Sequence, residues 1–125
     1  MDIVITSRDT PEYLLIESKG EVKTGTEMQD HCTLLFDEIL KYNNKKVLID
    51  EPGTRFPKDM FIYYDLVNYY LDNFPREIRF LKIAVVIAEE FKEVGRFWET
   101  VCVNKGLQYF AFTSFRDADD WLVKK

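Results

Sequence analysis

The sequence has few of the residues from which catalytic and metal sites are built. Its 125 residues include one histidine, His31, and two cysteines, Cys32 and Cys102. No Ser-His-Asp or Cys-His arrangement can be assembled convincingly around a single histidine. A Cys/His metal site needs more ligands than these three side chains supply. The sequence therefore predicts no catalytic residues, no metal and no cofactor.

Long apolar runs and clusters of positive charge are also absent. No uninterrupted apolar segment is long enough to cross a bilayer, and the first residues lack the basic and apolar regions of a secretory signal. The formal net charge is −5 and the lysines and arginines are scattered, so a nucleic-acid backbone would be repelled. No glycine-rich nucleotide-binding pattern is present. We expect a cytoplasmic protein without a transmembrane segment that binds no nucleic acid.

Aromatic side chains are abundant. The chain has 10 Phe, 7 Tyr and 2 Trp, and its length suits one domain with a single core. So much ring surface either builds a large core or leaves some for a partner.

Apolar strands alternate with amphipathic helices. The predicted strands are 3–6, 13–19, 47–49, 80–88 and 107–112, and the predicted helices are 24–42, 57–73, 90–105 and 114–122. The order β-β-α-β-α-β-α-β-α predicts an α/β domain spanning 1–125, with a mixed, mostly parallel sheet of about five strands and helices on both faces. Cys32 and Cys102 fall on apolar stripes of the first and third helices. We expect both to be reduced core residues, on opposite sides of the sheet.

The stretch after the third strand is the first candidate site. Strand 47–49 ends at two acids and a Pro-Gly pair, and a helix is expected to open on Pro57. Free amides of that helix suit an anion, whereas two neighbouring carboxylates repel one. The stretch is therefore either a structural connection or a partner-contact loop. The contact residues would be Asp50, Glu51, Gly53, Thr54 and Arg55.

Acids also follow the fourth strand. We expect Glu89 and Glu90 to lie near Asp50 and Glu51, at the carboxyl ends of the strands, where ligands of open α/β sheets bind. Clustered carboxylates could hold Mg²⁺ or Ca²⁺, as in phosphoacceptor receiver domains, but the lysine that a receiver needs after its last strand is missing. The alternative is that they are solvated acids in the first turn of the third helix.

The helix 57–73 has a wider apolar sector than one sheet contact requires. Its predicted core stripe consists of Met60, Tyr64, Val67, Leu71 and Phe74. Either the third helix covers the extra width, through Phe97 and Trp98, or another chain or ligand does. We predict an exposed association face, used most simply in a homodimer. It consists of Ile62, Tyr63, Leu66, Tyr69 and Tyr70.

The element order and the last third of the chain resemble STAS domains, particularly the SpoIIAA-like branch. The telling segments are Val86-Ile87-Ala88, Asn104-Lys105-Gly106-Leu107, and Phe112-Thr113-Ser114 leading into Ala118-Asp119-Asp120-Trp121-Leu122. The resemblance covers essentially the whole chain. It implies a small regulatory or partner-binding module, usually without catalysis.

The resemblance also bears on phosphorylation. Anti-sigma antagonists carry a phosphorylated Ser or Thr in the loop after the third strand. Here Pro52 occupies that position and Thr54 is the nearest hydroxyl, so we predict that Thr54 is not a regulatory phosphosite.

Two functions therefore remain open. The first is a non-enzymatic module that binds a protein partner. The alternative is a small carrier or sensor of an apolar, lipid-like ligand, because the branch is similar in shape to CRAL-TRIO lipid-binding domains and the aromatic residues suit an apolar pocket.

Overall fold

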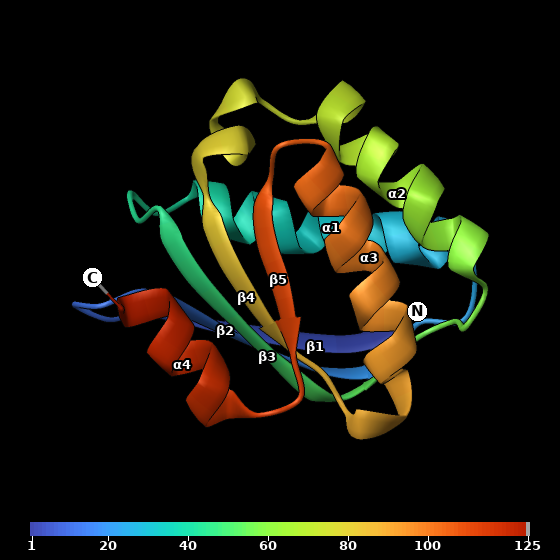
Figure 1. Cartoon of the computed structure of the whole chain (residues 1–125), viewed down its shortest axis with the longest axis horizontal. Coiled ribbons are helices and arrows are strands. Elements are labelled where there is room, and N and C mark those ends of the chain that lie inside the picture. The colour runs from blue at the N-terminus through green and yellow to red at the C-terminus, as the bar shows by residue number, and fades with distance from the viewer. Residues whose placement is uncertain (125) are drawn as a thin grey trace.

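Five strands form one mixed sheet in the order β1-β2-β3-β4-β5, in a computed structural model that describes residues 1–124 (Figure 1). The strands are β1 (Asp2–Asp9), β2 (Leu14–Glu21), β3 (Lys46–Arg55), β4 (Lys82–Val86) and β5 (Gln108–Phe112). β1 and β2 pair antiparallel, and the remaining neighbours pair parallel. The predicted fold class, with an antiparallel edge strand, is confirmed.

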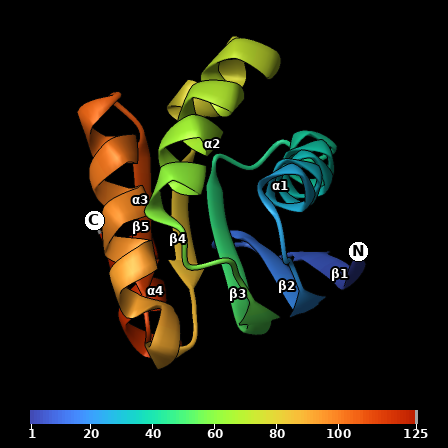
Figure 2. The same ribbon diagram turned by 90° about the vertical axis from the view of Figure 1, so that its right-hand side faces the viewer.

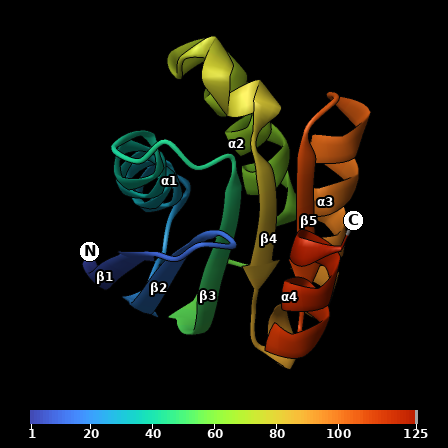
Figure 3. The same ribbon diagram turned by 90° about the vertical axis from the view of Figure 1, so that its left-hand side faces the viewer.

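Three helices cover one face of the sheet and one covers the other. The helices are α1 (Gly25–Leu40), α2 (Met60–Asn73), α3 (Lys92–Asn104) and α4 (Phe115–Val123), with short 3-10 helices at Arg76–Phe80 and Glu89–Phe91. Figure 2 is seen from the side of α2 and α3, and Figure 3 from the side of α4. The expectation that Cys32 and Cys102 lie on opposite sides is wrong, because α1 and α3 share a face and both cysteines belong to the same core cluster.

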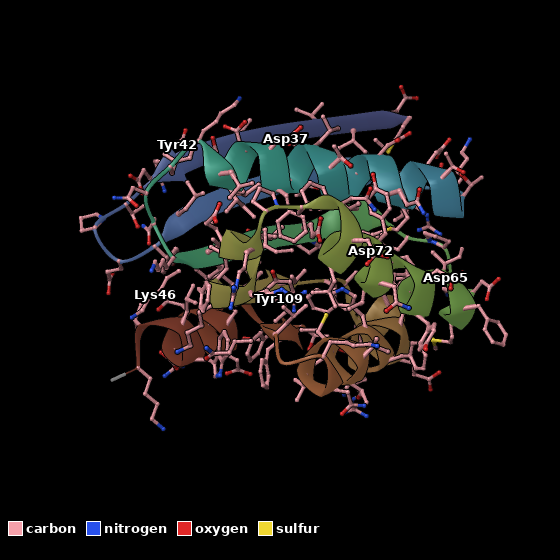
Figure 4. All side chains as sticks on the ribbon, turned by 90° about the horizontal axis from the view of Figure 1, so that it is seen from above. Asp37, Tyr42, Lys46, Asp65, Asp72 and Tyr109 are labelled. Atoms are coloured by element: carbon pink, nitrogen blue, oxygen red, sulfur yellow. The ribbon has the colours of Figure 1, made fainter. Side chains whose placement is uncertain are left out.

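Alternate strand residues point to two separate cores. Val47 and Ile49 face α1, α2 and α3, whereas Leu48 between them packs against Ala118 and Leu122 of α4. The three-helix side contains the larger core. Tyr109 of β5 lies at its centre, as Figure 4 shows, and is 1% exposed.

Side chains cap three of the helices where they begin. The Thr24 hydroxyl accepts from the Glu27 amide at 3.1 Å, and Ser114 accepts from Asp117 at 3.3 Å, as the sequence predicts. Asp59 accepts from the Phe61 amide at 3.0 Å, so α2 begins at Met60 rather than at Pro57.

The outer edge of β5 is partly closed by a side chain. The carboxylate of Glu99, on α3, accepts a hydrogen bond from the backbone amide of Ala111 at 2.8 Å. Among residues 1–124, no helix is long and apolar enough to cross a membrane.

Candidate functional site

A cavity of about 70 Å³ lies between the sheet and the three-helix layer. Its walls come from α1, α2, α3 and the inner faces of the central strands, and they are almost entirely apolar. The exceptions that matter chemically are His31 and Glu51, which face each other, and Tyr70.

His31 and Glu51 form a buried pair. Nε2 of His31 lies 3.0 Å from Oε1 of Glu51, and the two residues are 0% and 4% exposed. Glu51 follows Ile49 by two residues on β3, so it points to the same face as that core residue. Removing one partner of such a pair leaves the other buried without compensation, which is why buried pairs are costly to break.

The other ring nitrogen of His31 has no partner. Nδ1 is buried, and no atom of residues 1–124 forms a hydrogen bond with it. Buried polar atoms are satisfied in the large majority of cases, so this nitrogen is an exception within the core.

A second polar group in the cavity links all three helices. The Trp98 indole N–H, on α3, donates to the Tyr70 hydroxyl of α2 at 3.1 Å. That hydroxyl also lies 3.4 Å from the Cys32 sulfur of α1. Burial raises the pKa of Tyr70 well above its usual value, so its hydroxyl keeps its proton.

The two thiols are poor nucleophiles. Burial raises the pKa of Cys32 to about 12, and burial also raises the pKa of Cys102 above its usual range. Both are free and buried. Because the thiolate is the reactive form, neither sulfur is activated for covalent chemistry near neutral pH.

The predicted partner-contact loop is a strand. β3 continues to Arg55, pairing with β2 through Gly53, Thr54 and Arg55 after a bulge opposite Glu17–Lys19. The side chains of Glu51 and Thr54 point inward and are buried. Asp50 is half-buried. Its partial burial raises the pKa of its carboxyl group, and the nearby Glu17 carboxylate raises it further. Only Gly53 and Arg55 of the five residues are exposed.

The expected association face is largely core. Tyr63, Leu66 and Tyr70 are 3%, 1% and 3% exposed, and Ile62 and Tyr69 are half-buried. α2 lies between α1 and α3, and Trp98 of α3 covers the extra width, which is the alternative that the sequence left open. These residues therefore give no reason to expect a homodimer.

The outer side of α2 carries Tyr64, one residue of the predicted core stripe, whereas Val67 of that stripe is buried as expected. Tyr64 is 48% exposed and its neighbour Phe61 is 80% exposed. Figure 4 shows Asp65 and Asp72 on the same outer side.

The predicted acidic cluster does not form. Glu51 is buried against His31, whereas Glu90 lies 3.3 Å from Arg55 and 3.8 Å from Lys58. Within residues 1–124, no three His, Cys, Asp or Glu side chains are arranged to hold a metal ion.

Solved structures with the same arrangement cover nearly the whole chain. An anti-sigma factor antagonist from Mycobacterium paratuberculosis superposes with a TM-score of 0.60 at 12% identity, covering 97% of this chain and 94% of its own. An uncharacterized protein of the DUF3478 family with a SpoIIAA-like fold, from Shewanella loihica, gives a TM-score of 0.56 at 21% identity, covering 96% of this chain and 93% of its own. The chain has the SpoIIAA-like fold. No protein-family model and no curated protein sequence matches the chain.

Reasoning from the sequence missed His31 as part of a site. The signal was present in the spacing, because His31 lies three residues after Met28 and four before Leu35, on the predicted core stripe of α1. A histidine at such a position requires a buried partner. The sequence did not identify Glu51 as that partner, since the Pro-Gly pair made its segment look like a loop.

Proposed function

We propose that the protein is a non-enzymatic regulatory module that acts by binding another protein. The observation that carries this proposal is the surface around the start of α2, where Phe61 is 80% exposed. Arg55 and Lys58 lie close by and share Glu90 as a partner. An exposed ring beside charged side chains is the composition of a protein interface, in which an aromatic anchor is surrounded by a polar rim. We call Gly53, Arg55, Lys58, Phe61 and Glu90 the β3–α2 surface.

The absence of catalysis is part of the same proposal. The single histidine is buried against Glu51, and both thiols are protonated near neutral pH. The fold is shared with an anti-sigma factor antagonist, a protein whose name describes action on another protein. The similarity supports the proposal through fold alone.

Affinity capture with matched variants tests the partner. We expect the wild-type chain to retain a stoichiometric protein partner from extracts of its source cell. Phe61→Ser should lose that partner, because an exposed aromatic anchor contributes most of the binding energy of such interfaces. Phe80→Ser is the control, since Phe80 is 58% exposed but lies at the opposite end of the sheet, before β4. If both variants retain the partner equally, the β3–α2 surface is not the binding site. If the wild-type chain retains no stoichiometric partner, the proposed partner-binding function is excluded.

The cavity supports a second function, the binding of a small apolar ligand. A cavity that holds benzene has a volume of about 150 Å³, and the present one has about 70 Å³. A lipid chain exceeds this space unless the helices separate, so the ligand that we propose is smaller than the lipid-like one suggested by the sequence. Xenon is a suitable probe, because it enters apolar cavities without hydrogen bonding. Saturable amide shifts on α1, α2 and β4 are expected, and their absence would exclude this function.

A further inference from the structure

An open groove lies between the end of α2 and the 3-10 helix Arg76–Phe80. Figure 1 shows this 3-10 helix, in yellow, between α2 and the start of β4. The groove has a volume of about 420 Å³, within the range of about 300–1,000 Å³ that is usual for small-molecule pockets. Its apolar side consists of the half-buried Leu71 and Phe74, and its charged side consists of the exposed Arg76 and Arg79.

The two arginines extend from one side of the 3-10 helix. Such a helix has three residues per turn, so side chains at positions i and i+3 are eclipsed, as Arg76 and Arg79 are. Like charges held on one side repel each other. Glu77 and Asp72 are close in sequence, but no acid within residues 1–124 forms a salt bridge with either arginine. The groove therefore presents two uncompensated positive charges in a chain whose formal net charge is −5.

Both sides of the groove are attached to the larger core. Ile78, between the two arginines, is 1% exposed, and its carbonyl accepts a hydrogen bond from the Tyr109 hydroxyl of β5 at 2.6 Å. The ring of Phe74 packs on Phe36 of α1, with the ring centroids 4.8 Å apart. The charged and apolar sides are thus held in a fixed relative position, as a binding site requires.

The composition of the groove selects a ligand class. Guanidinium groups bind phosphate oxygens through paired, charge-assisted hydrogen bonds. A phosphate monoester carries about 1.5 to 2 negative charges at neutral pH, so one such group offsets both arginines, whereas a carboxylate offsets only one. We propose that the groove binds a phosphate monoester, with Arg76 and Arg79 holding the phosphate group while Leu71 and Phe74 contact the organic group.

This site is independent of both proposed functions. Phe61 of the β3–α2 surface lies in the first turn of α2, whereas Leu71 lies near the last residue of that helix. None of the four residues that line the groove lines the inner cavity. Loss of the groove as a binding site would leave both proposed functions standing.

Phenyl phosphate and two related anions test the ligand class. Phenyl sulfate has the same skeleton with one negative charge, and inorganic phosphate lacks the ring. Amide chemical shifts of the full chain, titrated with each anion at constant ionic strength, give the affinities. We expect saturable shifts over residues 71–80, and about tenfold tighter binding of phenyl phosphate than of the other two, which corresponds to about 1.4 kcal/mol. Equal binding of either anion, or no saturable shift with phenyl phosphate, would overturn the proposal.

Matched variants test the location. Arg76→Gln and Arg79→Gln should each weaken the binding of phenyl phosphate about tenfold and leave the thermal unfolding temperature unchanged, because both side chains are exposed. Lys45→Gln is the control, since Lys45 is an exposed cation at the same end of the sheet that does not line the groove. An equal loss of affinity in this control would overturn the proposal. So would arginine variants that unfold at a lower temperature with unchanged affinity, because the arginines would then only offset the dipole of α2.

Vesicles identify the source of the phosphate monoester. Phosphatidic acid presents a phosphate monoester at a membrane surface, whereas phosphatidylglycerol presents a diester with one negative charge. Phosphatidylcholine vesicles that contain either lipid, at equal surface charge, are sedimented with the wild-type chain and with Arg76→Gln. Retention by phosphatidic acid alone, abolished in the variant, would assign the groove to a lipid headgroup. Binding of phenyl phosphate without retention by vesicles would assign it to a soluble phosphate monoester.

Discussion

The side-chain oxygens of Ser18 and Thr54 lie 2.7 Å apart across the neighbouring strands β2 and β3, and both residues are buried. Each hydroxyl is the partner of the other, in a position shielded from solvent. Thr54 is the hydroxyl nearest to the position at which anti-sigma antagonists are phosphorylated, yet it is 1% exposed.

Thr54 should therefore stay unphosphorylated in the source cell. A kinase would have to separate β3 from its surroundings to reach the hydroxyl, and the product would place about two negative charges in a buried site. Phosphopeptide mapping of protein isolated from that cell is the measurement. Stoichiometric phosphate on Thr54 would contradict both the prediction and the buried position.

The hydrogen bond also predicts a stability effect. Thr54→Val keeps the shape of the side chain but leaves the Ser18 hydroxyl without its partner. We expect the free energy of unfolding to fall by about 1–3 kcal/mol in urea titrations. The double variant with Ser18→Ala should recover part of that loss, because no unpaired hydroxyl then remains; no recovery would show that the two oxygens are not coupled.

The two sides of α2 should respond to truncation in opposite ways. Leu66→Ala should lower the free energy of unfolding by about 2–5 kcal/mol, because this side chain is fully buried. Phe61→Ala should change it by less than about 0.5 kcal/mol, because the ring is exposed. Thermal or urea unfolding of the two variants measures both free energies of unfolding. A larger loss from Phe61→Ala than from Leu66→Ala would contradict the burial of Leu66 and the exposure of Phe61.

The buried pair predicts a graded effect at Glu51. Glu51→Ala should lower the free energy of unfolding by about 1–3 kcal/mol, because the His31 ring then loses its only side-chain hydrogen-bond partner within residues 1–124. Glu51→Gln retains an acceptor and should cost less. Unfolding titrations at neutral pH compare the two, and equal losses would indicate that packing rather than the hydrogen bond matters there.

Stability should fall in alkaline solution. Burial raises the pKa of Cys32 from its usual 9.0 to about 12 and raises that of Tyr70 in the same direction. Above about pH 9 the unfolded chain loses protons that the folded chain keeps, so the folded state becomes less favourable as the pH rises. The expected slope is roughly 1.4 kcal/mol per pH unit for each such group. Urea titrations between pH 8 and 10.5 measure it, with Cys32→Ala expected to show a smaller slope. A flat profile would contradict the burial of these groups.

The sequence predicts the elements well because each has a local signal. The α1 stripe from Met28 to Ile39 recurs at helical spacing and is buried as expected. The apolar segments within β3 and β4 are central strands, and Thr24 and Ser114 cap the helices that follow them. These features depend on neighbours a few residues apart, which a sequence shows directly.

Which helix lies on which face depends instead on strand order. Right-handed crossovers that always proceed to the next strand in the same direction place every connecting helix on one face. The observed order β1-β2-β3-β4-β5 therefore puts α1, α2 and α3 together, and leaves α4, which no strand follows, to cover the other. Sequence alone does not contain that order, so Cys32 and Cys102 were expected on opposite sides.

The orientation of α2 was missed for a related reason. Apolar residues surround much of this helix, so the pattern from Met60 to Phe74 fits more than one buried stripe. The choice is made by α1 and α3, which flank the helix and bury Tyr70 between Cys32 and Trp98. Which face of α2 is buried is therefore determined by its contacts with α1 and α3, and the spacing of apolar residues alone does not determine it.

The bond between Glu99 and the Ala111 amide has a consequence for self-assembly. An exposed strand edge is a template on which a strand of another molecule can add, the first step of sheet-to-sheet aggregation. At Ala111 the donor that an incoming strand would need is already bound to a carboxylate. An added strand would have to displace a charge-assisted hydrogen bond and leave an acid without its partner. One side chain from the helix beside it thus makes the β5 edge a poorer template for an added strand at Ala111.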